Sequence, residues 1–249
     1  MPFRDHFSKH ARQYAARRPR YPAGLFDYLA GLAPSNDLAW DCGTGNGQAA
    51  IQLARRFSRV IATDASARQI ENAFPHDRVS YRVEPAERTS IPSGSVDLIT
   101  VGTAVHWFDF NPFYAEVRRV GKPGAILAVW TYHLPSIDPA FDRLLERYYQ
   151  DILAGYWPDG FHYLDERYLT LPFPFEEIQP PQFFMEAEWE LDDLIGFLDT
   201  WSATRRYIED QGRHPLDDVI AELRTSWGEQ TRPRTIRWPL YFRIGRLAD

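Results

Sequence analysis

The chain has 249 residues, of which 44% are hydrophobic and 25% charged, and its formal net charge is −6. A chain of this length buries an ample core without covalent staples. The lone cysteine, Cys42, excludes a disulfide framework within the chain and fits a reducing compartment. The acidic balance argues against a broad nucleic-acid surface, no apolar run approaches the ~20 residues of a membrane span, and the N-terminus shows no apolar signal region. We therefore expect a cytoplasmic protein with no nucleic-acid and no membrane partner.

Two helices are expected first, over residues 5–17 and 22–33, separated by a Pro-x-x-Pro segment. Residues 36–130 then alternate strand and helix patterns, which is typical of a parallel sheet with helices on both faces. The fold class expected is α/β, with a Rossmann-like, doubly wound and mostly parallel sheet.

The glycine-rich turn after the first strand is the most informative segment. The apolar strand 38–42 runs into Gly43-Thr44-Gly45-Asn46-Gly47, which leads into a helix pattern over 49–57, and the next strand ends in Asp64. Glycines let the backbone approach a ligand closely, and a helix N-terminus offers free N–H groups to an anionic part of it. A carboxylate at the end of the second strand accepts hydrogen bonds from two ribose hydroxyls. This layout predicts a nucleotide site.

The spacing of the glycines indicates which nucleotide. The dinucleotide fingerprint is G-x-G-x-x-G, whereas here the third glycine comes one residue early and Asp41 stands two residues before the first. An acid followed by G-x-G-x-G resembles the first motif of class I S-adenosylmethionine-dependent methyltransferases. The resemblance implies S-adenosyl-L-methionine as cofactor and S-adenosyl-L-homocysteine as product, and we expect no metal. It implies the following cofactor contacts: Asp41, Gly43, Thr44, Gly45, Gly47, Asp64, Ala65, Ala86, Glu87, Thr103 and Ala104.

A second stretch narrows the resemblance to one branch of that class. Thr-Ala-Val-His-Trp-Phe-Asp at 103–109 resembles the Ala-x-His-Trp-Phe-Asp signature of a small-molecule branch that includes trans-aconitate methyltransferase-like proteins. The Lys-Pro-Gly turn at 122–124 is similar to the turn that leads to the family's fifth strand. The similarity extends over residues 7–130, although Pro85 stands where the family commonly has an acid. It implies the fold and the cofactor but leaves the methyl acceptor open.

The character of the chain changes after residue 130, where prolines and aromatic residues become dense. The segments expected there are helices over 138–153, 191–198 and 215–227 and strands over 183–187 and 235–247. In the family the last strands are antiparallel to the rest of the sheet, and chain between the fifth and sixth strands often forms a lid. We therefore expect N-terminal helices over the cofactor site (1–35), a cofactor-binding core (36–134), a lid insertion (135–175), and C-terminal strands and helices that complete the sheet and the substrate cover (176–249).

Methyl transfer requires a nucleophile in line with the methyl group and the exclusion of water, so positioning can supply most of the acceleration. A carboxylate acceptor needs no base, whereas a phenol or an amine does. The candidate bases are His106, Tyr14 and His133. Cys42 is interpreted as a buried structural thiol, because no histidine lies near it in the sequence.

Basic and aromatic residues at two places are candidates for binding the acceptor. Near the N-terminus, the string Tyr14-x-x-x-Arg18-Pro19-x-Tyr21-Pro22 is similar to the trans-aconitate-like branch, as is a Trp-Ser string that begins at Trp201. Arginine matches carboxylates with a planar fork of donors, although solvated helix faces explain these arginines as well. The substrate candidates are Arg18, Tyr21, Trp107, Arg205, Arg206 and Tyr207.

The leading hypothesis is an S-adenosylmethionine-dependent methyltransferase that acts on a small-molecule acceptor, by O-methylation of a carboxylate or hydroxyl. A non-catalytic S-adenosylmethionine-binding sensor or partner protein is the alternative, because fold alone does not fix function. An NAD(P)-dependent oxidoreductase is disfavoured by the glycine spacing. The protein is expected to be a monomer or a homodimer.

Overall fold

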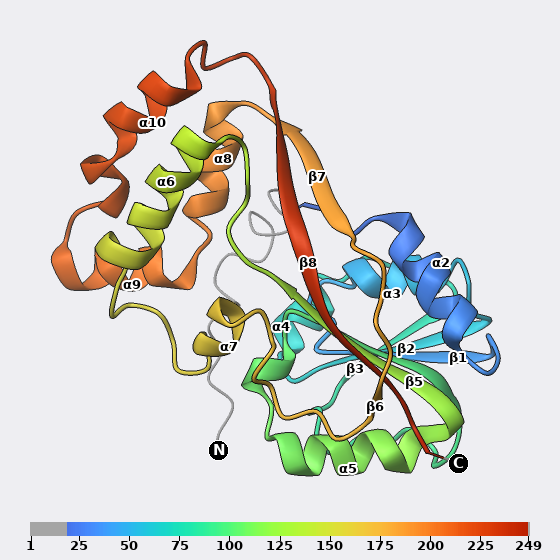
Figure 1. Ribbon diagram of the computed structural model, residues 1–249. Coiled ribbons are helices and arrows are strands. Elements are labelled where there is room, and N and C mark those ends of the chain that lie inside the picture. Colours follow the sequence, from blue (N-terminus) through green and yellow to red (C-terminus); the bar gives the residue numbers. More distant parts are fainter. Residues whose placement is uncertain (1–18, 249) are drawn as a thin grey trace.

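The computed structural model describes residues 19–248 (Figure 1). The helix expected over 5–17, with Tyr14 and Arg18, lies outside the described residues. The helix expected over 22–33 is confirmed as α2, and it packs Leu25, Phe26 and Leu29 into the core.

The described strands form one eight-stranded sheet in the order β3-β2-β1-β4-β5-β8-β6, with β7 paired to β8. Strands β1 to β5 are parallel, and β6, β7 and β8 are joined by antiparallel pairing, as expected from the sequence. The chain order reverses between β1 and β4, and ligands bind outside the carboxyl ends of the strands at such a switch point. The strands are β1 (Leu38–Cys42), β2 (Arg59–Asp64), β3 (Val79–Val83), β4 (Val96–Gly102), β5 (Gly121–Tyr132), β6 (Glu176–Glu177), β7 (Phe184–Trp189) and β8 (Arg234–Arg246).

Helices cover both faces of this sheet, α2 and α3 on one and α5 on the other (Figure 1). The α-helices of the described chain are α2 (Ala23–Leu32), α3 (Gln48–Leu53), α4 (Ala67–Glu71), α5 (Phe110–Val120), α6 (Pro139–Arg147), α7 (His162–Asp165), α8 (Leu191–Leu198), α9 (Ser202–Gln211) and α10 (Ile220–Trp227). Three short helical turns are η2 (Val105–Trp107), η3 (Tyr148–Ile152) and η4 (Pro215–Asp218). None of the helices within residues 19–248 is both long and apolar enough to cross a membrane.

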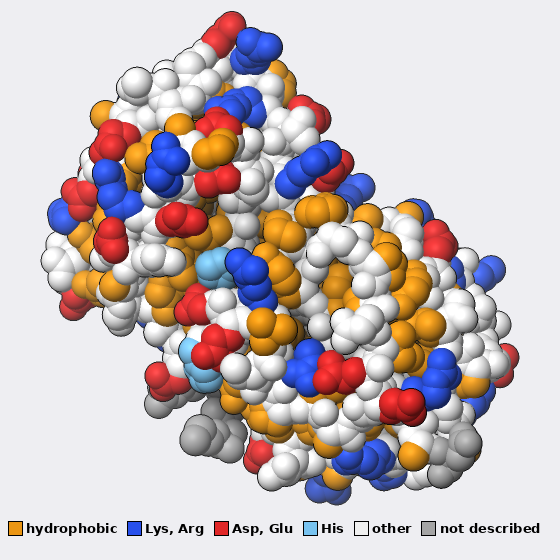
Figure 2. Space-filling model, viewed as in Figure 1, with side chains coloured by type: hydrophobic (Ala, Val, Ile, Leu, Met, Phe, Trp, Pro, Cys, Tyr) orange, Lys and Arg blue, Asp and Glu red, His pale blue; other side chains and the backbone are white. Residues whose placement is uncertain are grey.

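A cap formed by α6, α8, α9 and α10 stands above the carboxyl end of the sheet (Figure 1). It draws on chain from both sides of residue 176, because α6 comes before that position and α8 to α10 come after it. Strand β8 connects cap and core: Leu240–Arg246 pair with β5, whereas Arg234–Pro239 pair with β7. Figure 2 shows cap and core as two lobes, with charged side chains of both signs interspersed on this face.

Three expected helices differ from the structure in their extent. The helix expected over 138–153 is α-helical only to Arg147 and continues as the wider turn η3, in which the Leu153 N–H donates to the Tyr148 carbonyl. The helix expected over 215–227 is divided at Val219, whose φ of −132° interrupts the helical backbone. The helix expected over 49–57 ends at Leu53. Tyr148 and Val219 are both buried, and the apolar periodicity of the sequence continues through them, so that periodicity does not mark these two breaks.

Candidate functional site

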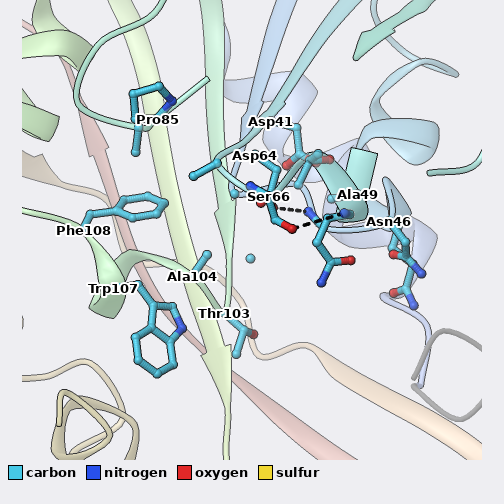
Figure 3. A pocket seen from close by; sticks show the side chains of 18 of the residues that line it. Asp41, Asn46, Ala49, Asp64, Ser66, Pro85, Thr103, Ala104, Trp107 and Phe108 are labelled. Carbon is cyan, nitrogen blue, oxygen red and sulfur yellow. Dashed lines mark hydrogen bonds between the residues drawn. The ribbon is translucent and has the colours of Figure 1, made fainter. Parts of the chain in front are cut away.

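A cleft with a volume of about 1310 Å³ opens at the switch point between β1 and β4. Figure 3 shows Asp41, Asp64 and Ser66 on one side of it and Trp107 and Phe108 on the other. Of the cofactor contacts expected from the sequence, ten line this cleft: Asp41, Gly43, Thr44, Gly45, Asp64, Ala65, Ala86, Glu87, Thr103 and Ala104. The lining also includes Asn46 and Ser66, which the sequence analysis did not select. Asn46 lies between Gly45 and Gly47, and Ser66 follows Asp64 and Ala65.

The three glycines of the turn are required for different structural reasons. All three have positive φ, 65° at Gly43, 55° at Gly45 and 86° at Gly47, a region that side chains disfavour. A Cβ at Gly43 would lie 2.7 Å from the Cβ of Ala104, so strand β1 can approach the end of β4 only with glycine there. Gly47 precedes α3 and packs against Tyr81; it shapes the turn and is not among the residues that line the cleft.

Asp64 at the end of β2 is fixed between two turns. Its Oδ2 accepts the backbone N–H of Gly45 at 2.9 Å, and its Oδ1 accepts that of Ser66 at 2.8 Å. Asp64 also lines the cleft, where a carboxylate can accept hydrogen bonds from ligand hydroxyls. This geometry holds an anionic acceptor in the cleft, as a ribose site requires.

Asp41 is buried at the end of β1, with 1% of its surface exposed. It accepts hydrogen bonds from Thr44 Oγ1 at 2.6 Å and Thr100 Oγ1 at 2.7 Å. Burial raises the pKa of Asp41 to about 6, against the lowering effect of these two hydroxyls. A cationic ligand would supply a positive charge beside Asp41 and so favour the ionised form of this carboxyl.

A second, smaller chamber of about 90 Å³ continues from the cleft beneath the cap. The two share Thr103, Trp107, Tyr132 and Trp157. Aromatic rings dominate the wall: Tyr149 lies 4.3 Å from Trp157, which stacks on Phe161 at 5.1 Å between ring centroids. We call this space the aromatic chamber. Its full lining is Thr103, His106, Trp107, Tyr132, His133, Leu134, Tyr149, Trp157, Phe161, Leu164, Phe197, Thr200, Trp201 and Ser202.

Two hydroxyl groups on the wall of the aromatic chamber are buried and have no hydrogen-bond partner within residues 19–248, those of Thr103 and Ser202. Thr103 is also one of the few residues other than glycine with positive φ, at 54°. Buried hydroxyls are normally satisfied, and strained backbone gathers at functional sites. Thr103 lies at the junction of cleft and chamber and Ser202 within the chamber, so both hydroxyls are placed where a ligand could pair with them.

Both histidine candidates that are described line the aromatic chamber. His106 is buried beside Trp107, its Nδ1 lies 2.8 Å from the Tyr168 hydroxyl, and burial lowers the pKa of His106 to about 3. His133 follows β5, and its Nε2 lies 3.1 Å from Asp165 on α7. His106 is therefore a neutral group at ordinary pH, whereas His133 is joined to a carboxylate.

The substrate candidates are only partly brought together. Tyr21, Trp107 and Arg206 line the cleft, whereas Arg205 and Tyr207 line neither cavity in the described structure. Arg206 also donates to the Tyr156 carbonyl at 3.3 Å. Trp157 and Phe161, which the sequence did not single out as site residues, line the aromatic chamber. The density of aromatic residues in that segment was a signal, but it does not show which way each ring faces. Ser202, part of the Trp-Ser string, lines the chamber as well.

Cys42 is buried, and that burial raises the pKa of its thiol well above the ordinary value. A protonated thiol is a poor nucleophile. The structure thus agrees with a structural thiol. The described residues contain no group of three or more His, Cys, Asp and Glu residues placed to hold a metal ion.

Comparisons with known proteins agree with this α/β nucleotide site. The methyltransferase domain family matches residues 40–129. A Dictyostelium discoideum protein named as a methyltransferase is 34% identical over 225 residues, which are 89% of this chain and 86% of that protein. A structure titled as a type II methyltransferase from Anaeromyxobacter dehalogenans has 43% identity and a TM-score of 0.88, covering 93% of this chain and 98% of that one. The chain belongs to the class I S-adenosylmethionine-dependent methyltransferases.

A more distant structure of the same fold, phosphoethanolamine N-methyltransferase 2 of Haemonchus contortus, was determined with S-adenosylhomocysteine. It is 15% identical, with a TM-score of 0.50, and covers 97% of this chain and 58% of that one. The protein described here is an enzyme that uses S-adenosylmethionine as cofactor. The carboxylates of Asp41 and Asp64 fit that group, because it carries cationic centres and two ribose hydroxyls.

Cofactor affinity is expected to depend on the ionisation of Asp41. A protonated Asp41 cannot balance a cationic ligand, so binding should strengthen as pH rises through the raised pKa of about 6. Between pH 5 and pH 7 the affinity for S-adenosylmethionine should rise about tenfold, since about ten times more of the carboxyl is ionised. Calorimetric titration at several pH values measures this change.

An Asp41→Asn variant is the control for that titration. It keeps the shape of the side chain and should show weaker binding with a flat pH dependence. A wild-type affinity that is constant from pH 5 to pH 7 would show that the ionisation of Asp41 does not affect cofactor binding.

Proposed function

We propose that the protein transfers the methyl group to an oxygen of a small-molecule acceptor that binds in the aromatic chamber. The observation that carries this proposal is the connection between chamber and cleft at Thr103 and Trp107, which line both. Ligand pockets are concave, mostly apolar and equipped with a few polar groups. The chamber has these properties, and its position supports a small acceptor over a protein or nucleic-acid surface.

The chain's residues supply binding and orientation in this reaction. When bound, the cofactor supplies a methyl group on a positively charged sulfur. The rings of Tyr149, Trp157 and Phe161 exclude water from the acceptor, and the buried hydroxyls of Thr103 and Ser202 can pair with its polar group. Pre-alignment of this kind is worth several kcal/mol of the barrier, on the order of 7–11 in favourable cases.

A panel assay tests the proposal. Methyl uptake from labelled S-adenosylmethionine is measured with small carboxylic acids, phenols and amines, and with transfer RNA and a protein mixture. Methylation of oxygen in at least one small acid or phenol, well above the uptake by the macromolecules, is expected. Cofactor binding with no methylated acceptor would favour the non-catalytic sensor, and methylation of the macromolecules would contradict the chamber as acceptor site.

Removal of one ring from the aromatic chamber should impair use of the acceptor and leave cofactor binding unchanged. Phe161 lies 5.8 Å from the ring of Trp107 and 5.1 Å from that of Trp157, and it lines the chamber but not the cleft. We expect Phe161→Ala to lower kcat/KM for a small acceptor by about 10²-fold, because misplacement of the acceptor by about 1 Å has that effect.

The matched control is Phe184→Ala, which removes an exposed ring on β7. It should leave both turnover and binding of S-adenosylhomocysteine as in the wild type. If Phe161→Ala weakened S-adenosylhomocysteine binding as much as it lowered turnover, the chamber would belong to the cofactor instead.

A further inference from the structure

A carboxylate of α7 faces one histidine of the aromatic chamber. Asp165 ends α7, and its Oδ1 lies 3.1 Å from His133 Nε2. The hydroxyl of Tyr149 donates to the same oxygen at 2.6 Å. The Tyr149 ring also packs edge-on against His133, with ring centroids 4.8 Å apart. Two contacts thus fix the imidazole of His133, and the three residues involved come from separate segments of the chain.

This arrangement sets which nitrogen of His133 is available. Asp165 is an acceptor, so it selects the form in which Nε2 carries the proton and donates it. His133 Nδ1 has no hydrogen-bond partner within residues 19–248, and His133 lines the aromatic chamber. A histidine held by a carboxylate, with its other nitrogen free, has the geometry of a general base.

The neighbouring groups support this assignment. Burial alone would raise the pKa of Asp165, but the hydrogen bonds from His133 and Tyr149 outweigh it and lower that pKa, so Asp165 remains an anion. Burial, and then the bond to Asp165, raises the pKa of Tyr149, which keeps Tyr149 a neutral donor. Two further titratable groups lie on the chamber wall: Tyr132 at the end of β5, and His106, whose Nδ1 already lies at the Tyr168 hydroxyl.

We propose that Asp165 is a positioning residue that holds His133 as the general base for a neutral hydroxyl acceptor, a phenol or an enol, in the aromatic chamber. This inference rests on the proposed function and narrows it, because a carboxylate acceptor is already an anion and needs no base. The aromatic wall fits a flat, unsaturated acceptor, and the chamber of about 90 Å³ takes only part of it, with the rest toward the cleft.

The proposed step balances. The acceptor O–H gives its proton to His133 Nδ1, and the oxygen forms a bond to the methyl carbon. The bond from that carbon to sulfur breaks, and its electron pair stays on sulfur to give neutral S-adenosylhomocysteine. The imidazolium is stabilised by Asp165 and returns its proton to water, since 21% of the His133 side chain is exposed.

The experiment compares phenol, 4-nitrophenol and benzoate as acceptors for the full chain and three variants. We expect methylation of a phenol by the wild type. His133→Gln should lower kcat/KM for it by about 10²-fold or more, the contribution of a general base. Asp165→Asn should lower it by about tenfold, because the base remains but is no longer oriented. Glu166→Gln, the neighbouring carboxylate on the same segment, is the matched control and should change nothing.

A second readout does not depend on turnover. In the presence of S-adenosylhomocysteine, bound 4-nitrophenol should be converted to the yellow phenolate more fully than free 4-nitrophenol at the same pH. That excess should disappear in His133→Gln, fall in Asp165→Asn and persist in Glu166→Gln. A merely structural Asp165 would not change this absorbance.

The outcomes separate this inference from the proposed function. If benzoate were methylated but neither phenol was, His133 would not be a general base, whereas O-methylation of a small molecule would still hold. A phenol methylated equally well by the wild type and Asp165→Asn, with equal phenolate absorbance, would also overturn this inference. If neither acceptor class bound or reacted while the cofactor bound, both proposals would be wrong.

Discussion

Replacement of Asp64 by alanine is expected to abolish useful cofactor binding. The carboxylate is held by the backbone N–H groups of Gly45 and Ser66 and lies open to the cleft. Two hydrogen bonds to a charged group contribute about 3–6 kcal/mol together, so affinity for S-adenosylhomocysteine should fall about 10²- to 10⁴-fold. Calorimetric titration measures the loss directly.

Asp77→Ala is the matched control, because Asp77 is an exposed acid just before β3. It changes the net charge by the same amount and should leave the affinity as in the wild type. Thermal unfolding of both variants shows whether they are folded. A folded Asp64→Ala protein that still bound S-adenosylhomocysteine within a fewfold of wild type would contradict a ribose site at β2.

Replacement of Gly43 by alanine is expected to damage both stability and binding. Its φ of 65° costs about 1–2 kcal/mol for a residue with a Cβ. The added carbon would also lie 2.7 Å from Ala104 Cβ and 3.1 Å from the Phe108 ring, and such overpacking costs about 1–3 kcal/mol more. The free energy of unfolding should therefore fall by about 2–5 kcal/mol, measured by urea denaturation.

Gly45→Ala separates the two causes of that loss. Gly45 has nearly the same backbone, with φ of 55°, but a Cβ there would meet no atom within 4 Å. Only the cost of the backbone conformation remains, so we expect Gly45→Ala to lose about 1–2 kcal/mol. If the two variants were equally destabilised, the close approach of β1 to Ala104 would have no energetic consequence.

The sequence could predict that Asp41, Asp64 and glycines between them gather at one cleft, because they are close together in the chain. Asp41, the three glycines and Asp64 lie within 24 consecutive residues, and one strand–turn–helix–strand unit brings them together. Gly47, which the sequence grouped with the cofactor contacts, is not among the residues that line the cleft, and it packs against Tyr81. Spacing along the chain cannot distinguish a glycine that makes room for a ligand from one that makes room for a side chain.

The acceptor end was not predictable to the same extent. The sequence singled out Arg205, Arg206 and Tyr207 together, but successive helical residues point in different directions, and only Arg206 of α9 reaches the cleft. It also named both His106 and His133 as candidate bases, and their surroundings in the structure differ. Their difference comes from burial and from Asp165, which lies 32 residues away from His133 in the chain.

The sequence by itself determined the α/β class, the parallel core, the family and its cofactor, because periodicity and a short motif encode them within neighbouring residues. Tertiary structure alone decided where η3 interrupts the helix after α6, how β8 serves both core and cap, and which side chains enclose the aromatic chamber. The chamber draws on residues from Thr103 to Ser202. Its shape depends on how buried rings pack across distant segments, and no local pattern carries that information.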